Sequence, residues 1–183
     1  MYSERYYKKW CNQMESKELL RNQITSAAGN VVYTYIAHWD IVNRLKNKNK
    51  RIKVIQILLT AFSTGGFVTL FLGAKWLSWV GAVSSTIALA INLYMLNFDI
   101  TEDIKNHYNA ANELWYVREK YKSLLVDFDD LTLNEIRVRR DELMSMVSAI
   151  NHKYLGTDSK SIANAKEKKG EYIFEENEAQ KLL

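Results

Sequence analysis

The chain has 183 residues, of which 25% are charged and none is proline. This length fits one helical unit and excludes two large domains. Its single cysteine excludes an intramolecular disulfide and therefore a disulfide-rich secreted fold. The absence of proline favours long helices with few sharp breaks, and no stretch has a convincing strand pattern. The sequence predicts an all-α protein.

Residues 1–53 predict a polar N-terminal helical arm. Apolar residues recur there close to a helical period, at Leu20, Ile24, Ala27 or Ala28, Val31, Tyr35, Ile36 and Trp39. This pattern predicts helix from about residue 6 to residue 46. Gly29 and Asn30 interrupt the pattern and leave open whether the arm is one helix or two.

Two uncharged stretches follow the arm, and only Lys75 separates them. Residues 54–74 are 21 residues without a charge, and residues 76–98 are 23 more. A helix that crosses a bilayer needs about 20 mostly apolar residues. The sequence therefore predicts a transmembrane hairpin over 54–98, with two spans, a short turn and both termini on the same side of the membrane.

The distribution of charge predicts the orientation of this hairpin. Residues 1–53 contain 11 Lys and Arg against 4 Asp and Glu, a net charge of +7, whereas Lys75 is the sole charge in the opposite loop. Because cytoplasmic loops are enriched in Lys and Arg, we expect a multi-pass membrane protein with both termini in the cytoplasm. The basic residues gather directly before the first span, at Arg44, Lys46, Lys48, Lys50, Arg51 and Lys53. We expect this run to contact anionic lipid rather than nucleic acid, with a nucleotide as the alternative.

Small residues recur at every fourth position in both spans. The set is Ala61, Gly65, Thr69 and Gly73 in the first span, and Ala82, Thr86 and Ala90 in the second, with Gly81 and Ser85 beside them. Small faces let membrane helices approach closely, so these residues are expected to pack the hairpin together. The alternative is that one face contacts neighbouring copies or lines a pore, with polar groups from Ser63, Thr64, Ser84, Ser85, Thr86 and Asn92. Two spans cannot enclose a water-filled path, so a pore would require a homo-oligomer.

Residues 99–168 predict a second helical arm that forms a hairpin. The second span is expected to continue as helix to about residue 128, with an apolar stripe of Ile100, Ile104, Tyr108, Ala111, Trp115, Tyr121, Leu125 and Phe128. Asp127, Asp129 and Asp130 indicate a turn, and Thr132 with Glu135 is typical of a capping box. The next helix is expected to present Leu133, Ile136, Leu143, Val147 and Ile150 and to end near residues 151–156.

The remaining residues predict little further structure. A short helix is expected around residues 162–168. Residues 169–183 form a mostly acidic tail, which we expect to be loosely ordered.

No constellation of catalytic residues is present, and we expect no enzyme activity, no metal and no cofactor. His38, His107 and His152 lie on three different segments, and no Cys/His pair has the spacing of metal ligands. Arg137 and Arg140 share a helix face and are the best candidates in this arm for an anionic ligand. Salt bridges to Glu135, Asp141 or Glu142 are the expected alternative.

The order of these segments resembles the SLATT family, the two-transmembrane effector domains associated with bacterial nucleotide-signalling conflict systems. The resemblance covers roughly residues 15–168. It rests on this topology together with the local sequences RIKVIQILL at 51–59, Ser63-Thr64 within the first span, LWYVREKY at 114–121 and RDEL at 140–143. It implies a pore-forming or membrane-disrupting effector of antiphage defence in the bacterial inner membrane, downstream of a partner nucleotidyltransferase that makes a cyclic nucleotide signal.

Two other interpretations remain open at this point. The hairpin could tether a helical interaction module without forming a pore, which would make the protein a membrane-anchored adaptor. The two apolar stretches could also be a buried helical hairpin in a soluble all-α protein, which would be extracted without detergent.

Overall fold

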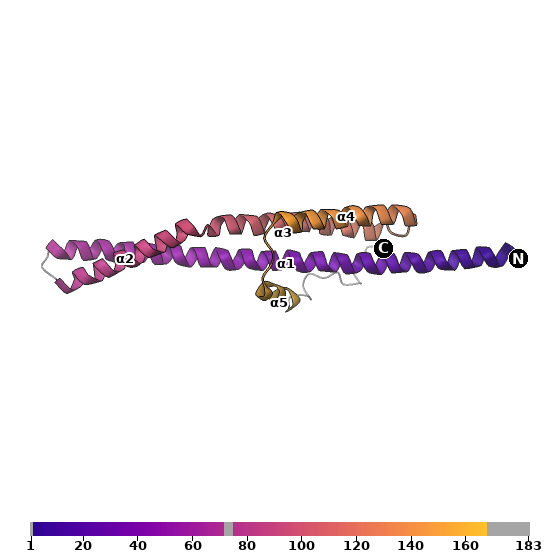
Figure 1. Ribbon diagram of the computed structural model, residues 1–183. Helices are drawn as coiled ribbons and strands as arrows, with labels where there is room; N and C mark the ends of the chain where they lie inside the picture. The colour runs from indigo at the N-terminus through magenta and orange to yellow at the C-terminus, as the bar shows by residue number, and fades with distance from the viewer. Residues whose placement is uncertain (1, 72–74, 168–183) are drawn as a thin grey trace. The chain divides into compact units, whose positions relative to one another are not determined.

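The computed structural model describes residues 2–71 and 75–167. Over these residues the chain forms helices and no strand, so the prediction of an all-α protein is confirmed. The helices are α1 (Tyr2–Phe71), α2 (Lys75–Asn97), α3 (Ile100–Val126), α4 (Leu133–Lys153) and α5 (Ser159–Glu167), as Figure 1 shows. The predicted turn between the two apolar stretches and the predicted acidic tail lie outside the described residues.

Helix α1 runs without a break through Gly29 and Asn30 and through the basic run before residue 54. The N-terminal arm is therefore one helix, continuous with the first apolar stretch. A glycine inside a helix costs about 1 kcal/mol relative to alanine. The side chains beside it, Ala28, Val31 and Val32, are all buried, so packing outweighs this local preference.

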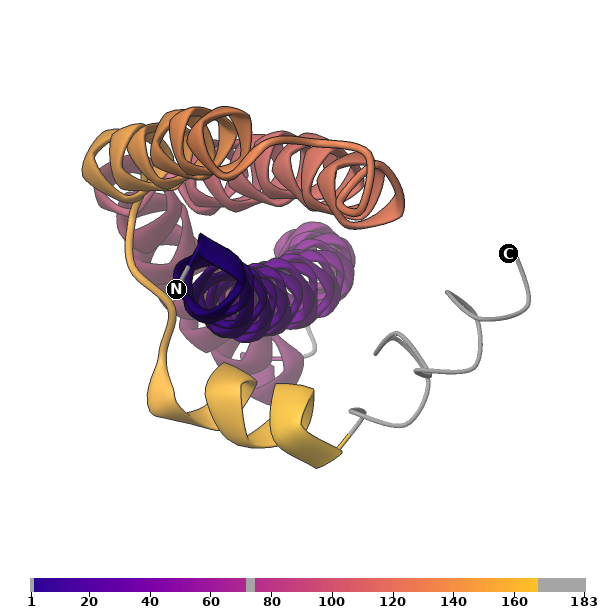
Figure 2. The same ribbon diagram turned by 90° about the vertical axis from the view of Figure 1, so that its right-hand side faces the viewer.

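The chain divides into two compact units, the first comprising residues 1–41 and 106–183 and the second residues 42–105. In the first unit, α3 and α4 pack along α1, and Figures 1 and 2 show all three side by side. Their common core consists of Leu20, Ile24, Ala28, Val31, Leu114, Val117, Tyr121, Leu124, Phe128, Ile136, Leu143 and Ile150. The predicted faces of α1 and α4 are largely confirmed by this core.

The predicted stripe on α3 was wrong in part. Trp115 is 48% exposed, and its neighbour Tyr116 is 54% exposed. Tyr108 of the predicted stripe is also exposed, at 40%. The predicted Tyr121 is buried, and Leu114 and Val117 are core positions that the prediction missed. The aromatic residues misled the prediction because large apolar side chains are common on protein surfaces as well as in cores.

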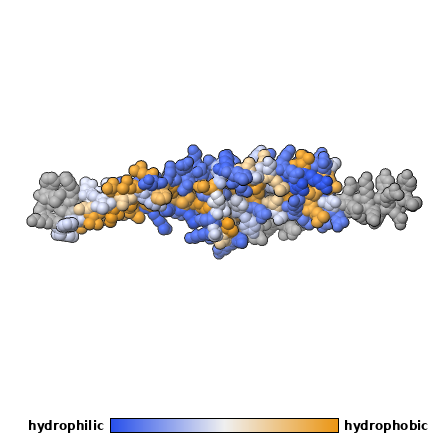
Figure 3. All heavy atoms as spheres, viewed as in Figure 1, coloured by the Kyte–Doolittle hydropathy of each residue, from blue (hydrophilic) through white to orange (hydrophobic). Residues whose placement is uncertain are grey.

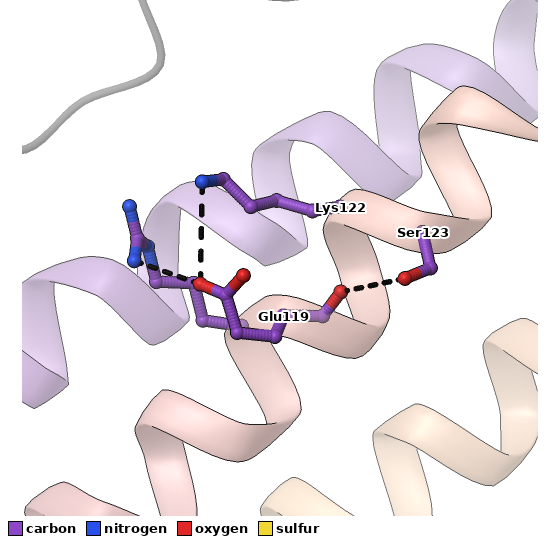
Figure 4. Close-up of polar contacts among 4 residues, drawn as sticks. Glu119, Lys122 and Ser123 are labelled. Carbon is purple, nitrogen blue, oxygen red and sulfur yellow. Dashed lines mark hydrogen bonds and ion pairs between the residues drawn. The ribbon is translucent and has the colours of Figure 1, made fainter.

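The polar face of α3 carries local ion pairs. The Glu119 carboxylate accepts a hydrogen bond of 2.9 Å from Arg118 and forms an ion pair with Lys122 at 4.0 Å (Figure 4). The Ser123 hydroxyl donates to the backbone carbonyl of Glu119. The side chains of these three charged residues are 20 to 37% exposed, so they are half-buried.

Each of three helices begins at a side-chain cap. The predicted capping box of α4 is confirmed, because Thr132 and Glu135 each bond the other's backbone N–H group. At α3, the carboxylate of Asp99 accepts from the N–H groups of Thr101 and Glu102 at 2.9 and 3.0 Å. The expected continuous helix was therefore wrong here, because α2 ends at Asn97 and Asp99 starts a new helix. At α5, the carboxylate of Asp158 accepts from the Ser161 N–H group at 2.7 Å.

Helix α5 packs on the side of α1 that faces away from α3 and α4, as Figure 2 shows. Ala165 is buried against Val32, Ile36 and Ala37 of α1 in a small second core. This arrangement leaves α1 covered on two opposite sides within the first unit.

Candidate functional site in the helical hairpin

The second unit is an antiparallel pair formed by the last part of α1 and by α2. The Ser63 and Ser85 hydroxyls hydrogen-bond to each other across the pair. Seven residues away on each helix, the Gln56 amide donates to the Asn92 amide oxygen at 2.7 Å. Residues seven apart lie on the same side of packed helices. The two bonds therefore fix one register along the hairpin.

The half-buried residues of α1 show how this pair is built. Between residues 49 and 65, the half-buried residues of α1 recur with alternating spacings of three and four residues: Asn49, Ile52, Gln56, Leu59 and Ser63. The corresponding buried and half-buried residues of α2 are Gly81, Ser84, Ala88, Ile91 and Met95. This is the spacing of coiled-coil packing, in which one side of each helix meets the partner continuously. We call these ten residues and the bonded Ser85 and Asn92 the hairpin seam.

The surface around the seam is apolar. Large hydrophobic residues are exposed on both helices, with Ile57 at 68% and Phe62 at 59% among the highest. The others are Val54, Ile55, Leu58, Val80, Val83, Ile87, Leu89, Leu93 and Leu96, besides Trp76 and Trp79. Figure 3 shows hydrophobic residues gathered over the described part of this hairpin. A soluble protein rarely exposes so large an apolar surface, which is typical of a partner or membrane contact.

The small residues singled out from the sequence do not all lie at the seam. Ala61, Gly65, Ala82, Thr86 and Ala90 are exposed. A Cβ atom added at Gly65 would meet nothing within 4 Å. Gly81 is buried, and Ser63, Ser85 and Asn92 bond across the seam. The Thr69 side chain and Gly73 lie outside the described residues.

The threonine hydroxyls of the hairpin are satisfied within their own helices. Thr60, Thr64 and Thr86 each donate to the backbone carbonyl four residues earlier, at 2.8 to 3.1 Å. Such bonds let a hydroxyl remain in an apolar environment without a further partner. Thr64 and Thr86, both expected as polar lining, are thus compatible with contact to lipid.

At the base of the hairpin, one lysine of the basic run contacts an aromatic pair. The Lys48 ammonium donates to the Tyr94 hydroxyl at 3.1 Å and lies 5.5 Å from the centre of its ring. The Tyr94 ring in turn packs on Phe98, with 4.8 Å between ring centres. Tyrosine and lysine are typical anchors at a membrane interface. The other lysines and Arg51 in the run are exposed, and Arg44 is half-buried.

The arginines considered for an anionic ligand take different environments in the first unit. Arg140 pairs with Asp141 at 2.8 Å and donates to the Gln23 amide oxygen of α1 at 3.1 Å, whereas Arg137 is exposed. Arg140 therefore links α4 to α1, in line with the expected salt bridge. In the described part of the chain, no group of three or more His, Cys, Asp or Glu side chains could hold a metal ion.

One stretch of the described residues, Trp79–Val126, contains a segment long and apolar enough to cross a membrane. Only 11% of that segment is buried, whereas the core helix of a soluble protein would be mostly buried. The sequence matches the SMODS and SLOG-associating 2TM effector domain family 4 (SLATT_4) over residues 20–178. The chain belongs to this SLATT family. The resemblance drawn from the sequence is confirmed, and the chain is an effector domain of a membrane-associated family.

The residues that match SLATT family 4 come from both compact units of the chain. No curated protein and no solved structure matched the sequence. The exposed apolar segment and the two-transmembrane description of the family together indicate a membrane protein. Among the four residues that bond across the seam, Gln56 is the one that the sequence reasoning missed, although its seven-residue spacing from Asn49 and Ser63 was visible in the sequence.

Proposed function

We propose that this SLATT protein is a pore-forming or membrane-disrupting effector of a bacterial antiphage defence system, and that it acts as a homo-oligomer in the inner membrane. The observation that carries the proposal is a hairpin that bonds Gln56 to Asn92 and Ser63 to Ser85 across one seam and exposes apolar side chains elsewhere. Such a hairpin suits lipid, where polar groups need internal partners. Because two helices cannot enclose a water-filled path, several copies must combine to permeabilise the membrane.

We further propose that residues 54–74 and 76–98 cross the bilayer as two spans, with residues 1–53 and 99–183 in the cytoplasm. The antiparallel bonds of the hairpin and the Lys48–Tyr94 contact at its base support this topology. The test uses single cysteines in a chain whose Cys11 is replaced by serine. A membrane-impermeant maleimide should label Lys75→Cys in intact spheroplasts and should label the exposed Ser145→Cys only after lysis. Labelling in the reverse order would overturn the topology.

The exposed small faces are the proposed contacts between copies. Ala61 and Gly65 on α1 leave open space beside them, and Ala82, Thr86 and Ala90 form a similar exposed face on α2. Membrane helices associate most closely where such small residues meet. A bulky side chain on this face should keep copies apart without disturbing the seam.

The test is controlled expression in bacteria with a membrane-potential dye and a propidium-type permeability dye. The unmodified chain should depolarise the cells rapidly. Gly65→Leu, which adds volume but no charge, should abolish depolarisation, and the matched variant Gly65→Ala should retain it. If cells that express inserted Gly65→Leu chain depolarise as fast as the unmodified chain, the small face does not join copies.

The second part of the proposal concerns the signal that activates the effector. The resemblance to effectors of nucleotide-signalling systems suggests a cyclic nucleotide made by a partner nucleotidyltransferase. If expression alone leaves the cells polarised, the assay is repeated with candidate cyclic nucleotides and with the products of neighbouring genes. Polarised cells under every condition, with the chain shown to be inserted, would overturn the pore-forming proposal.

A membrane-anchored adaptor is the second candidate function. The observation that favours it is the first unit, which has its own core and exposes the aromatic side chains of Trp115 and Tyr116. Exposed aromatic residues are enriched at protein interfaces. An adaptor would keep its function after residues 54–98 are exchanged for an unrelated transmembrane hairpin, whereas a pore-forming effector would lose it.

A further inference from the structure

The hairpin seam contains a row of polar side chains on α1. On α1, every seventh residue of the seam is polar, at Asn49, Gln56 and Ser63. Ser, Asn and Gln side chains commonly hydrogen-bond across interfaces between membrane helices, and such bonds are weak. The polar groups are concentrated where α1 and α2 meet.

Two carboxamide side chains of this seam bond to each other. Gln56 and Asn92 carry the only carboxamides between residues 54 and 96 of the sequence, and the two bond to each other. Ser63 and Ser85 likewise use their hydroxyls on each other. Because the hydroxyls of Thr60, Thr64 and Thr86 bond to backbone carbonyls, the outer faces of the described part of the hairpin offer few free hydrogen-bond donors to water or to an ion. A ring of hairpins in this closed state would therefore enclose a largely apolar lumen.

Asn49 shows that the seam is not fully satisfied within one chain. Its amide oxygen is buried and has no hydrogen-bond partner among the described residues. A buried acceptor of this kind usually finds a water molecule or a further polar group. It lies seven residues before Gln56, so it continues the same polar row toward the base of the hairpin.

We propose that the hairpin described here is the closed state of the effector, and that permeabilisation requires α1 and α2 to separate at the seam. On separation, Gln56, Ser63, Ser85 and Asn92 would exchange their mutual hydrogen bonds for bonds to water or to a second copy of the chain. Bonds of this kind between membrane helices are weak, and exchange for water costs little. This inference rests on the proposed function and identifies the groups that would line its water-filled path.

The test locks the seam with a disulfide. Ser63→Cys/Ser85→Cys is made in the Cys11→Ser chain, because the two hydroxyls already lie in contact. Depolarisation is followed in spheroplasts, under the condition in which the Cys11→Ser chain depolarises them, with an added thiol oxidant and then a reductant. Oxidation should slow depolarisation at least tenfold, and reduction should restore it. Equal depolarisation by the reduced and fully cross-linked chains would overturn the inference.

The matched control is Phe62→Cys/Leu89→Cys, which places two cysteines on exposed apolar positions that do not bond across the seam. Oxidation should leave its depolarisation unchanged. If the oxidant slows this variant as much as the seam variant, the effect is not seam locking and the inference fails. If the Cys11→Ser chain and the unmodified chain both leave cells polarised under every condition, the proposed function fails and this inference falls with it.

A second measurement does not depend on cross-linking. A Ser63→Cys variant of the Cys11→Ser chain is exposed to a charged, water-soluble thiol reagent before and after the onset of depolarisation. If the seam opens to water, the rate of modification should rise at least tenfold. A rate that stays constant through depolarisation would overturn the inference even if the disulfide impairs folding.

Discussion

His38 on α1 and His107 on α3 hydrogen-bond to each other through their Nδ1 atoms, which are 2.8 Å apart. Both side chains are buried, and their ring centres are 5.1 Å apart. Only one of the two Nδ1 atoms can donate in this bond, so the other must be free of a proton. Burial, and then the charge of His107, lower the pKa of His38 from 6.5 to about 4.

This lowered pKa predicts that the first unit loses stability in mild acid. The unfolded chain binds a proton at His38 below about pH 6.5, whereas the folded chain resists protonation down to about pH 4. The stabilisation of the fold by neutral His38 is therefore fully present above pH 6.5. As the pH falls from 6.5 to 4, roughly 3 kcal/mol of the free energy of unfolding is lost. Thermal unfolding of the detergent-solubilised chain, followed by circular dichroism, should show the midpoint falling from pH 7 to pH 4.5.

The control for this prediction is His152→Gln, since His152 is exposed. That variant should keep the acid sensitivity, whereas His38→Gln should flatten it between pH 4.5 and pH 6.5. An identical pH profile for the unmodified chain and His38→Gln would show that the buried pair does not control acid stability.

The capping box of α4 predicts a local effect of Thr132→Ala. The Thr132 N–H group donates to the Glu135 carboxylate at 2.9 Å, and hydrogen bonds from Thr132 lower the pKa of Glu135. Loss of a threonine cap costs about 1 kcal/mol. Amide hydrogen exchange in the first turn of α4 should rise about fivefold. Thr25→Ala, at an exposed position inside α1, should leave that turn unchanged.

The core of the first unit predicts different effects for two neighbouring positions on α4. Ile136 is fully buried among α1, α3 and α4, whereas Val138 is exposed. Ile136→Ala should lower the free energy of unfolding by about 2–5 kcal/mol. Val138→Ala should change it by no more than about 0.5 kcal/mol. Urea titration of the two purified chains, side by side, measures both values, and equal effects would contradict the assigned core face.

Local patterns in the sequence were sufficient to predict some of these features and insufficient to predict others. The capping box at Thr132 and the buried face of α4 depend on residues within two turns of one another, so periodicity revealed them. The position of Trp115 depends on how α3 is rotated against α1, and neighbouring apolar residues did not determine that rotation.

Pairings between distant residues were the least predictable. His38 and His107 lie 69 positions apart, and Gln56 and Asn92 lie 36 apart. Each pair depends on the register of two helices, which is set by all the contacts between them and not by either local sequence. The break before α3 was predictable from the local sequence, because aspartate commonly caps helices and Asp99 caps α3.

The packing of α5 on α1 predicts that a negative charge at position 165 releases α5 from α1. Ala165 is almost fully buried against Val32, Ile36 and Ala37, and the nearby Asn164 amide donates to both carboxylate oxygens of Asp40 at 3.1 Å. Ala165→Asp would bury an unpaired carboxylate, which is costly enough to expel a helix of nine residues. Limited trypsin digestion should then cut at Lys160 and Lys166 at least tenfold faster, with α3 and α4 still protected. The matched variant Ala163→Asp, at an exposed position of the same helix, should digest like the unmodified chain, and equal cleavage of both variants would refute this packing.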